Sequence, residues 1–211
     1  METSKFKLEW RALELCRGDR CLQSGLNGAV EAGQAIVLRG PNGCGKTTLL
    51  RALCGLTMAE SGEILWQGTE LHKCRSDYYQ HVAYSGHISG LKQDLTTREN
   101  LRFAARMRGR HPNQNELLQG LGLQHCADLP VRSLSAGQRR RATLALTLGS
   151  GAELWVLDEP YTNLDKAGCA WLGRRLNDHL NMGGLLLMAV HQDSLIDASR
   201  EIVHELPGAQ P

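Results

Sequence analysis

Short apolar runs alternate with amphipathic segments along most of the 211-residue chain. The apolar runs have the length of strands, and several lead into stretches with the apolar spacing of a helix. We expect strands at residues 35–39, 62–67, 81–85, 154–157 and 185–190, and helices at residues 47–56, 115–121, 136–148 and 166–180. Such an alternation is typical of an α/β protein with a mostly parallel sheet.

Two regions depart from this alternation. Residues 5–38 show loose alternation and a turn signal at Arg17-Gly18-Asp19-Arg20, which predicts short strands. Residues 88–135 carry no strand pattern. Thr96 and Glu99 form a capping box there, before an apolar helical face, and residues 109–113 break that helix. We therefore expect one domain over residues 1–211, with a helical subdomain at roughly 88–135.

Composition narrows the class of protein. Charge is nearly balanced, with 24 Lys and Arg against 22 Asp and Glu, and aromatic residues make up 5%. Both values argue against a nucleic-acid binder. No apolar run approaches the length of a bilayer span, and the first residues lack the apolar core of a signal peptide, so we expect no direct membrane insertion. The seven cysteines show no CxxC spacing, which favours free thiols.

A glycine-rich loop follows the strand at residues 35–39. Its sequence, Gly40-Pro-Asn-Gly-Cys-Gly-Lys-Thr47, fits G-x-x-x-x-G-K-[ST] between a strand and a helix. Backbone N–H groups of such a loop cradle phosphates, the lysine reaches the β- and γ-phosphates, and the threonine hydroxyl ligates Mg²⁺. The predicted nucleotide-binding residues here are Gly40, Pro41, Asn42, Gly43, Cys44, Gly45, Lys46, Thr47 and Thr48. Because Cys44 precedes a helix N-terminus and Lys46, we also expect a reactive thiol.

An acidic pair ends the strand at residues 154–157. Charges at the end of a buried strand need partners, and a site for Mg²⁺ and a triphosphate supplies them. Asp158 is placed to hold Mg²⁺ through water. Glu159 is placed to polarise an attacking water as a general base.

A third motif separates this chain from other phosphate-loop proteins. Leu134-Ser-Ala-Gly-Gln138 lies upstream of the acidic pair, Thr162-Asn-Leu-Asp165 lies downstream, and His191 ends an apolar strand. In this order the motifs resemble the ABC-transporter nucleotide-binding domain, over essentially the whole chain. The resemblance implies that Ser135, Gly137 and Gln138 of one subunit cap the γ-phosphate held by another, and that His191 is the catalytic switch histidine.

The sequence leaves the roles of two residues open. His87 stands where the family usually has a metal-associated glutamine, so it is either a ligand of Mg²⁺-bound water or a loop histidine. Arg17 stands where the family usually stacks an aromatic ring on adenine. Its guanidinium could stack on the base, or it could be a solvated turn residue. Preference for ATP over GTP is implied only by the family.

The resemblance extends to a subfamily. Residues 84–101 and the segment Leu134-Ser-Ala-Gly-Gln-Arg-Arg-Arg141 look like the ATP-binding subunits of cytochrome c biogenesis, the haem-exporter type of bacteria. The fold implied is a P-loop NTPase core with a mostly parallel sheet, an antiparallel β subdomain and a helical insert. The implied partners are integral membrane subunits and a second copy of the chain, at the cytoplasmic face of the inner membrane, with ATP and Mg²⁺ bound.

Three alternatives remain at this point. The chain could serve another ABC exporter. It could be a non-transport ABC ATPase, although it lacks both the long coiled coil of repair types and the duplicated domain of translation types. A P-loop kinase would leave the Leu134–Gln138 segment and His191 unexplained.

Overall fold

The computed structural model describes residues 6–86, 89–109 and 113–208. The strands and α-helices, in chain order, are β1 (Lys7–Arg17), β2 (Arg20–Glu31), β3 (Ala35–Arg39), α1 (Lys46–Leu53), β4 (Ser61–Trp66), β5 (Thr69–Glu70), α2 (Arg75–His81), β6 (Val82–Ser85), α3 (Thr97–Met107), α4 (Gln114–Gly120), α5 (Ala136–Leu148), β7 (Leu154–Asp158), α6 (Lys166–Asn181), β8 (Leu185–Ala189) and β9 (Glu201–Glu205). Short 3-10 helices lie at Leu71–Lys73, Gln124–Cys126 and Val131–Ser133.

A five-stranded sheet in the order β6-β7-β8-β3-β9, with all pairs parallel, forms the centre of the fold. Both faces of this sheet are covered. Ile36 and Leu38 of β3 join one apolar core, beneath α1, while Ala35 and Val37 join the other, beneath α5 and α6. Side chains alternate across a strand, so strands that are apolar on both faces read as continuous apolar runs. That is the pattern from which the sequence predicted them.

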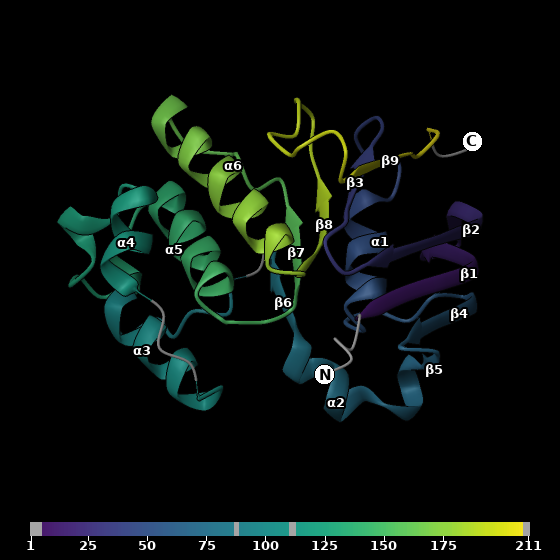
Figure 1. The fold of residues 1–211 in the computed structure, drawn as a ribbon, viewed down its shortest axis with the longest axis horizontal. Coiled ribbons are helices and arrows are strands. Elements are labelled where there is room, and N and C mark those ends of the chain that lie inside the picture. Colours follow the sequence, from purple (N-terminus) through teal and green to yellow (C-terminus); the bar gives the residue numbers. More distant parts are fainter. Residues whose placement is uncertain (1–5, 87–88, 110–112, 209–211) are drawn as a thin grey trace.

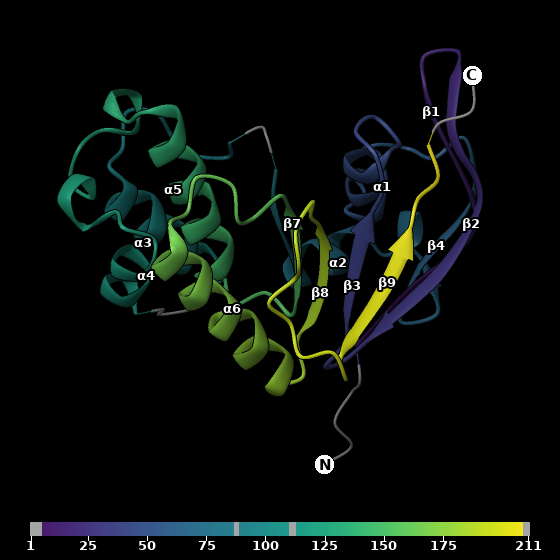
Figure 2. The same cartoon turned by 90° about the horizontal axis from the view of Figure 1, so that it is seen from above.

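The antiparallel part is a four-stranded sheet in the order β2-β1-β4-β5. β1 and β2 form a long hairpin whose turn lies at Gly18 and Asp19, as the turn signal predicted. Trp10 of β1 and Trp66 of β4 are each 1% exposed and belong to the core shared with α1. Figures 1 and 2 show this sheet on the opposite side of the parallel sheet from α3, α4 and α5.

The helical part follows β6. Thr96 caps α3 through the predicted capping box, since its side chain accepts from the Glu99 N–H and the Glu99 side chain accepts from the Thr96 N–H. α3, α4 and α5 bury leucines against one another and against α6. The expected mostly parallel sheet, antiparallel sheet and helical insert are therefore all confirmed.

Some elements were not predicted. Helix α2 has seven residues and only Tyr78 buried, too little for an apolar period to show. Its last residue, His81, was expected to begin a strand, and β6 starts at Val82 instead. Strand β9 has polar residues at both ends and at its fourth position, so no apolar run marks it. It forms through backbone pairing with β3 at the edge of the sheet.

A buried histidine lies between α6 and the sheet. The His179 ring stacks on the Trp155 indole, with ring centroids 3.7 Å apart and an interplanar angle of 4°. Its Nε2 lies 3.2 Å from the Leu185 carbonyl oxygen, and the residue is 6% exposed. Burial lowers the pKa of His179 from its usual 6.5 to about 4.

This shift predicts acid sensitivity. The unfolded chain takes up the proton at a higher pH than the folded chain, so the stabilisation is complete above pH 6.5 and is lost as the pH falls toward about 4. The loss amounts to about 3 kcal/mol at one pKa unit per 1.4 kcal/mol. Denaturant unfolding of wild type and His179→Gln, compared across this window, should show a steeper decline for wild type. If the free energies of unfolding of the two proteins declined in parallel, the lowered pKa of His179 would be contradicted.

Candidate functional site

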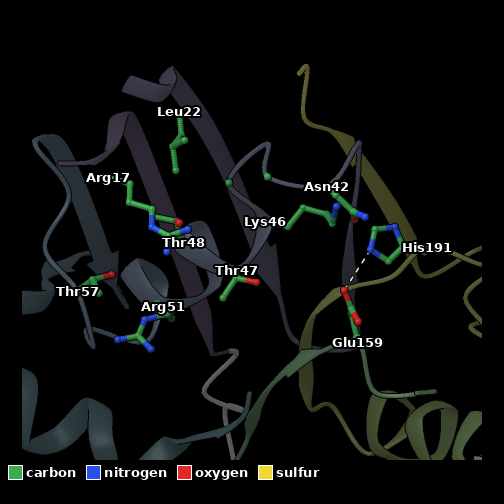
Figure 3. A pocket seen from close by; sticks show the side chains of 12 residues that line it. Arg17, Leu22, Asn42, Lys46, Thr47, Thr48, Arg51, Thr57, Glu159 and His191 are labelled. Atoms are coloured by element: carbon green, nitrogen blue, oxygen red, sulfur yellow. Dashed lines mark hydrogen bonds and ion pairs between the residues drawn. The ribbon is translucent and has the colours of Figure 1, made fainter. Parts of the chain in front are cut away.

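The carboxyl ends of β3, β7 and β8 lie next to one another at one edge of the parallel sheet. Residues that follow these strands surround a cavity of about 560 Å³. Figure 3 shows side chains of the β1–β2 hairpin, of α1 and its loop, and of the segments after β7 and β8 around it. The lining residues are Arg17, Leu22, Asn42, Gly43, Gly45, Lys46, Thr47, Thr48, Arg51, Thr57, Glu159 and His191.

The loop after β3 has a backbone that requires glycine. Gly40, Gly43 and Gly45 have φ values of 142°, 79° and 109°, in a region that residues with a Cβ rarely adopt. Gly45 precedes the first turn of α1, so the positive end of that helix faces the cavity. The Lys46 ammonium donates to the carbonyl oxygens of Gly40, at 2.7 Å, and Pro41, at 3.1 Å. An ammonium has three donors, so these contacts fix its position and leave one N–H for another acceptor.

The Thr47 hydroxyl and the Asp158 carboxylate bring two side-chain oxygens together next to the phosphate loop. The Thr47 hydroxyl donates to Asp158 Oδ2 at 2.8 Å, which joins the start of α1 to the end of β7. Asp158 is 2% exposed. Arg140 of α5 donates to the backbone carbonyl of Asp158, which fixes the strand end from the other side. Hydroxyl and carboxylate oxygens are suitable ligands for Mg²⁺. This ion usually takes one or two protein ligands besides phosphates and waters.

A second acidic residue faces a histidine across the cavity. Glu159 Oε1 lies 3.1 Å from His191 Nε2, as the dashed line in Figure 3 shows. Glu159 has φ 51°, an unfavourable conformation for a residue with a Cβ, and its N–H donates to the Ala189 carbonyl at 2.9 Å. Strain of this kind costs on the order of 1–3 kcal/mol and recurs at functional sites. The bond to β8 holds the backbone in the conformation that brings the carboxylate toward His191.

The turn end of the β1–β2 hairpin closes the cavity from the other sheet. Arg17 and Leu22 line it, as Figure 3 shows. Arg51 and Thr57, which were not predicted, also line it.

Gln23 was not predicted either. Its amide donates to the Cys44 carbonyl at 2.9 Å and to the Pro207 carbonyl at 2.8 Å, which ties the phosphate loop to the segment after β9. Nothing in its sequence context marks this role.

The structure does not bring every predicted residue to this cavity. Ser135, Gly137 and Gln138 begin α5 and do not line it. Ser135 and Gln138 form a reciprocal capping box, with Ser135 exposed. Arg141 of the same helix donates to the Asn163 carbonyl at 2.8 Å. Arg140 and Arg141 are thus both bonded within the chain.

Two further predictions need comment. Cys44 is 1% exposed and packs in the core beneath α1, so the thiol expected to be reactive is buried in this structure. The Cys44 N–H donates to the Pro41 carbonyl at 3.3 Å and its carbonyl accepts from Gln23, so both backbone groups are bonded within the protein. His87 lies outside the residues that the structure describes.

A glycine-rich loop at a helix start, between strands of a parallel sheet and beside an Asp-Glu strand end, defines a P-loop nucleotide-binding protein. Comparisons with known proteins specify the family. The family model described as ABC transporter matches residues 23–162. The chain therefore belongs to the ABC transporter family.

Several curated relatives share much of the sequence. The chain is 43% identical over 189 residues to the "Cytochrome c biogenesis ATP-binding export protein CcmA" of Nitrosospira multiformis, which covers 88% of this chain and 92% of the relative. It is 44% identical over 185 residues to the protein of that name from Escherichia coli, with 88% and 89% covered.

Solved structures agree on the fold. A structure described as the ATP binding subunit of an ABC transporter superposes with a TM-score of 0.76 at 26% identity, over 87% of this chain and 79% of that one. A putative ABC transporter ATP-binding protein from Pyrococcus furiosus gives 0.75 at 24% identity, over 95% and 97%.

The Gln23 contacts lead to a prediction on stability. Gln23→Leu keeps the approximate side-chain size but leaves the Cys44 and Pro207 carbonyls without their amide donor. Since an unpaired buried acceptor costs about 1–3 kcal/mol, the free energy of unfolding should fall by that amount. Chemical denaturation measures it, with the exposed neighbour Ser24→Ala as the matched control. Equal midpoints for the two variants would refute the role of Gln23.

Proposed function

We propose that this chain is the ATP-hydrolysing subunit of an ABC transporter that serves cytochrome c biogenesis as a haem exporter. The observation that carries the proposal is the 43–44% identity, over 88% of the chain, to proteins named for ATP-binding export in cytochrome c biogenesis. The chain covers 92% and 89% of those relatives, so the likeness extends over nearly their whole length. We also propose that residues 1–211 act as one ATP-binding domain.

The phosphate loop binds the triphosphate in this proposal. Backbone N–H groups of the loop and the positive end of α1 would stabilise the phosphate oxygens. Lys46 is held at the loop by two carbonyls, and its remaining N–H would donate to the β- and γ-phosphates. Asn42 and Thr48 lie along the same cavity.

Thr47 and Asp158 would hold Mg²⁺, Thr47 directly and Asp158 through water. Their oxygens, 2.8 Å apart, fit the oxygen ligands this ion prefers. The bound ion would neutralise charge that develops on the phosphates. His87 is proposed as a further residue near the metal, in the position of the family's glutamine.

Hydrolysis depends on Glu159 and His191. The Glu159 carboxylate accepts hydrogen bonding from a water and polarises it for attack on the γ-phosphorus. Attack forms the new oxygen–phosphorus bond as the bond to the ADP oxygen breaks, and the proton of the water passes toward Glu159. His191, 3.1 Å from Glu159, orients the carboxylate.

The cavity alone does not complete this site. Ser135, Gly137 and Gln138 do not line it, so in this proposal they act on nucleotide bound by a second copy. The N-terminus of α5 offers N–H donors and a positive dipole end to that γ-phosphate.

The proposed location of this chain follows from its proposed membrane partners. Among the described residues, none of the helices is both long enough and apolar enough to cross a bilayer. Work on a membrane cargo thus falls to integral membrane subunits, and we propose that this chain binds them peripherally at the cytoplasmic face of the bacterial inner membrane. Arg17, at the cavity edge, is proposed to stack on the base of ATP.

The general-base assignment gives a kinetic prediction. Glu159→Gln should still bind ATP, but hydrolysis in the assembled complex should fall about 10²–10⁴-fold, because the amide cannot take the proton. With hydrolysis blocked, an ATP-bound dimer should accumulate. Phosphate release and sedimentation velocity, with Mg-ATP and the membrane subunits present, measure these effects.

The matched control is Glu63→Gln, an exposed carboxylate on β4 that does not line the cavity. It should keep wild-type turnover. Wild-type turnover of Glu159→Gln, or a purely monomeric species at saturating ATP, would count against the roles proposed here.

The cargo assignment gives a cellular prediction. A clean deletion of this subunit should remove haem-stained c-type cytochromes, and a plasmid copy should restore them. Lys46→Ala should fail to restore them, because the phosphate-facing charge is lost, whereas the exposed Lys73→Ala should succeed. Normal c-type cytochromes in the deletion strain would leave the ATPase assignment standing and remove haem export.

A further inference from the structure

The turn end of the β1–β2 hairpin places two cysteines opposite each other. In the antiparallel register Cys16 pairs with Cys21, one position before the Arg17–Arg20 pair that closes the turn. Side chains of directly opposed residues leave the sheet on the same face, with Cβ atoms about 4.5–5.5 Å apart. The two sulfurs are therefore brought together by strand pairing alone.

A carboxylate completes the group. Glu14 lies two residues before Cys16, on the same face of β1. One carboxylate oxygen of Glu14 and the sulfurs of Cys16 and Cys21 all lie within 4.8 Å of one another. The Cys21 thiol lies 3.8 Å from Glu14 Oε1, and the Ser61 hydroxyl donates to the other oxygen, Oε2, at 3.1 Å. Ser61 thus orients the carboxylate so that Oε1 faces the sulfurs.

We propose that Glu14, Cys16 and Cys21 form a binding site for a thiophilic divalent cation of the Zn²⁺ class. Two sulfurs and a carboxylate oxygen are ligands that suit Zn²⁺, and three protein ligands leave a fourth, tetrahedral position for water or an outside ligand. A hydrogen bond that holds a ligating carboxylate, such as that from Ser61, is the usual support of such a site. This site is separate from the proposed function, whose Mg²⁺ ligands are oxygens.

A metal ion binds such a site as the thiols release their protons. Cys21 is exposed and Glu14 and Cys16 are half-buried, so the ion reaches the site from solvent.

The position connects the site to the nucleotide cavity. Cys16 and Cys21 are followed by Arg17 and Leu22, which line that cavity. Cys21 is exposed whereas Leu22 is buried, so the cation site lies on the solvent side of the hairpin. A bound ion joins the two strands directly behind Arg17 and Leu22.

Binding of Zn²⁺ to the reduced full-length chain tests the proposal. Competition with a chromophoric chelator should give a site that depends on both sulfurs. Loss of an outer hydrogen-bond partner typically lowers affinity by 10–100-fold, so Ser61→Ala should lower it by about 10-fold and Cys16→Ser or Cys21→Ser by more than about 100-fold. Cd²⁺ should give a sulfur-to-metal charge-transfer band that both Cys variants lose. Cys74→Ser, a half-buried cysteine elsewhere, should keep it.

A second readout does not depend on the variants. Zn²⁺ should protect Cys16 and Cys21 from alkylation, read by peptide mass, and leave Cys74 unprotected. A charge-transfer band that survives both Cys variants, or equal alkylation with and without Zn²⁺, would overturn the proposal. Unchanged thermal unfolding of the Cys variants without metal shows that the lost binding is not a loss of fold.

Discussion

Parallel pairing of β7, β8 and β3 is the constraint on which the site depends. The register aligns Asp158 with Ala189, and Ala189 with Leu38, so that the strands end at one level. The glycine-rich loop, the acidic pair and His191 each follow directly from one of these ends. Because a slip of one residue would exchange the buried faces of a strand, two apolar cores hold the register in place. The packing that stabilises the sheet therefore also positions the chemistry.

Helix α5 is tied to the same edge of the parallel sheet, although its N-terminus does not line the cavity. Arg140 donates to the Asp158 carbonyl and Arg141 to the Asn163 carbonyl, so α5 holds both the end of β7 and the segment before α6. Within one chain, the N-terminus of α5 lies outside the pocket that holds Lys46. Any shift of α5 is thereby linked to the acidic strand end. In the proposed dimer, this link would be a physical route from a second copy at Ser135 to Asp158 and Glu159.

Sequence reasoning found the parts of the site whose chemistry depends on residue type at fixed spacing. Gly43 and Gly45, Lys46 with Thr47, and the acidic strand end were all identifiable because backbone conformation and ligand chemistry restrict those positions. Strands buried on both faces were equally clear.

The features that sequence reasoning missed depend on contacts between residues that are distant in sequence. Gln23 acts through carbonyls of residues 44 and 207, β9 forms only because β3 offers an edge, and α2 is too short to carry an apolar period. The Cys16–Cys21 pairing follows from hairpin register. None of these has a local signal.

A determined structure of the chain with Mg²⁺ and a non-hydrolysable ATP analogue tests the central claim most directly. The account predicts a triphosphate along Gly43–Thr48 of one copy, with Glu159 and His191 beside the γ-phosphate and Ser135 of a second copy against it. A nucleotide bound away from this loop, or a triphosphate whose contacts all come from one chain, would contradict it.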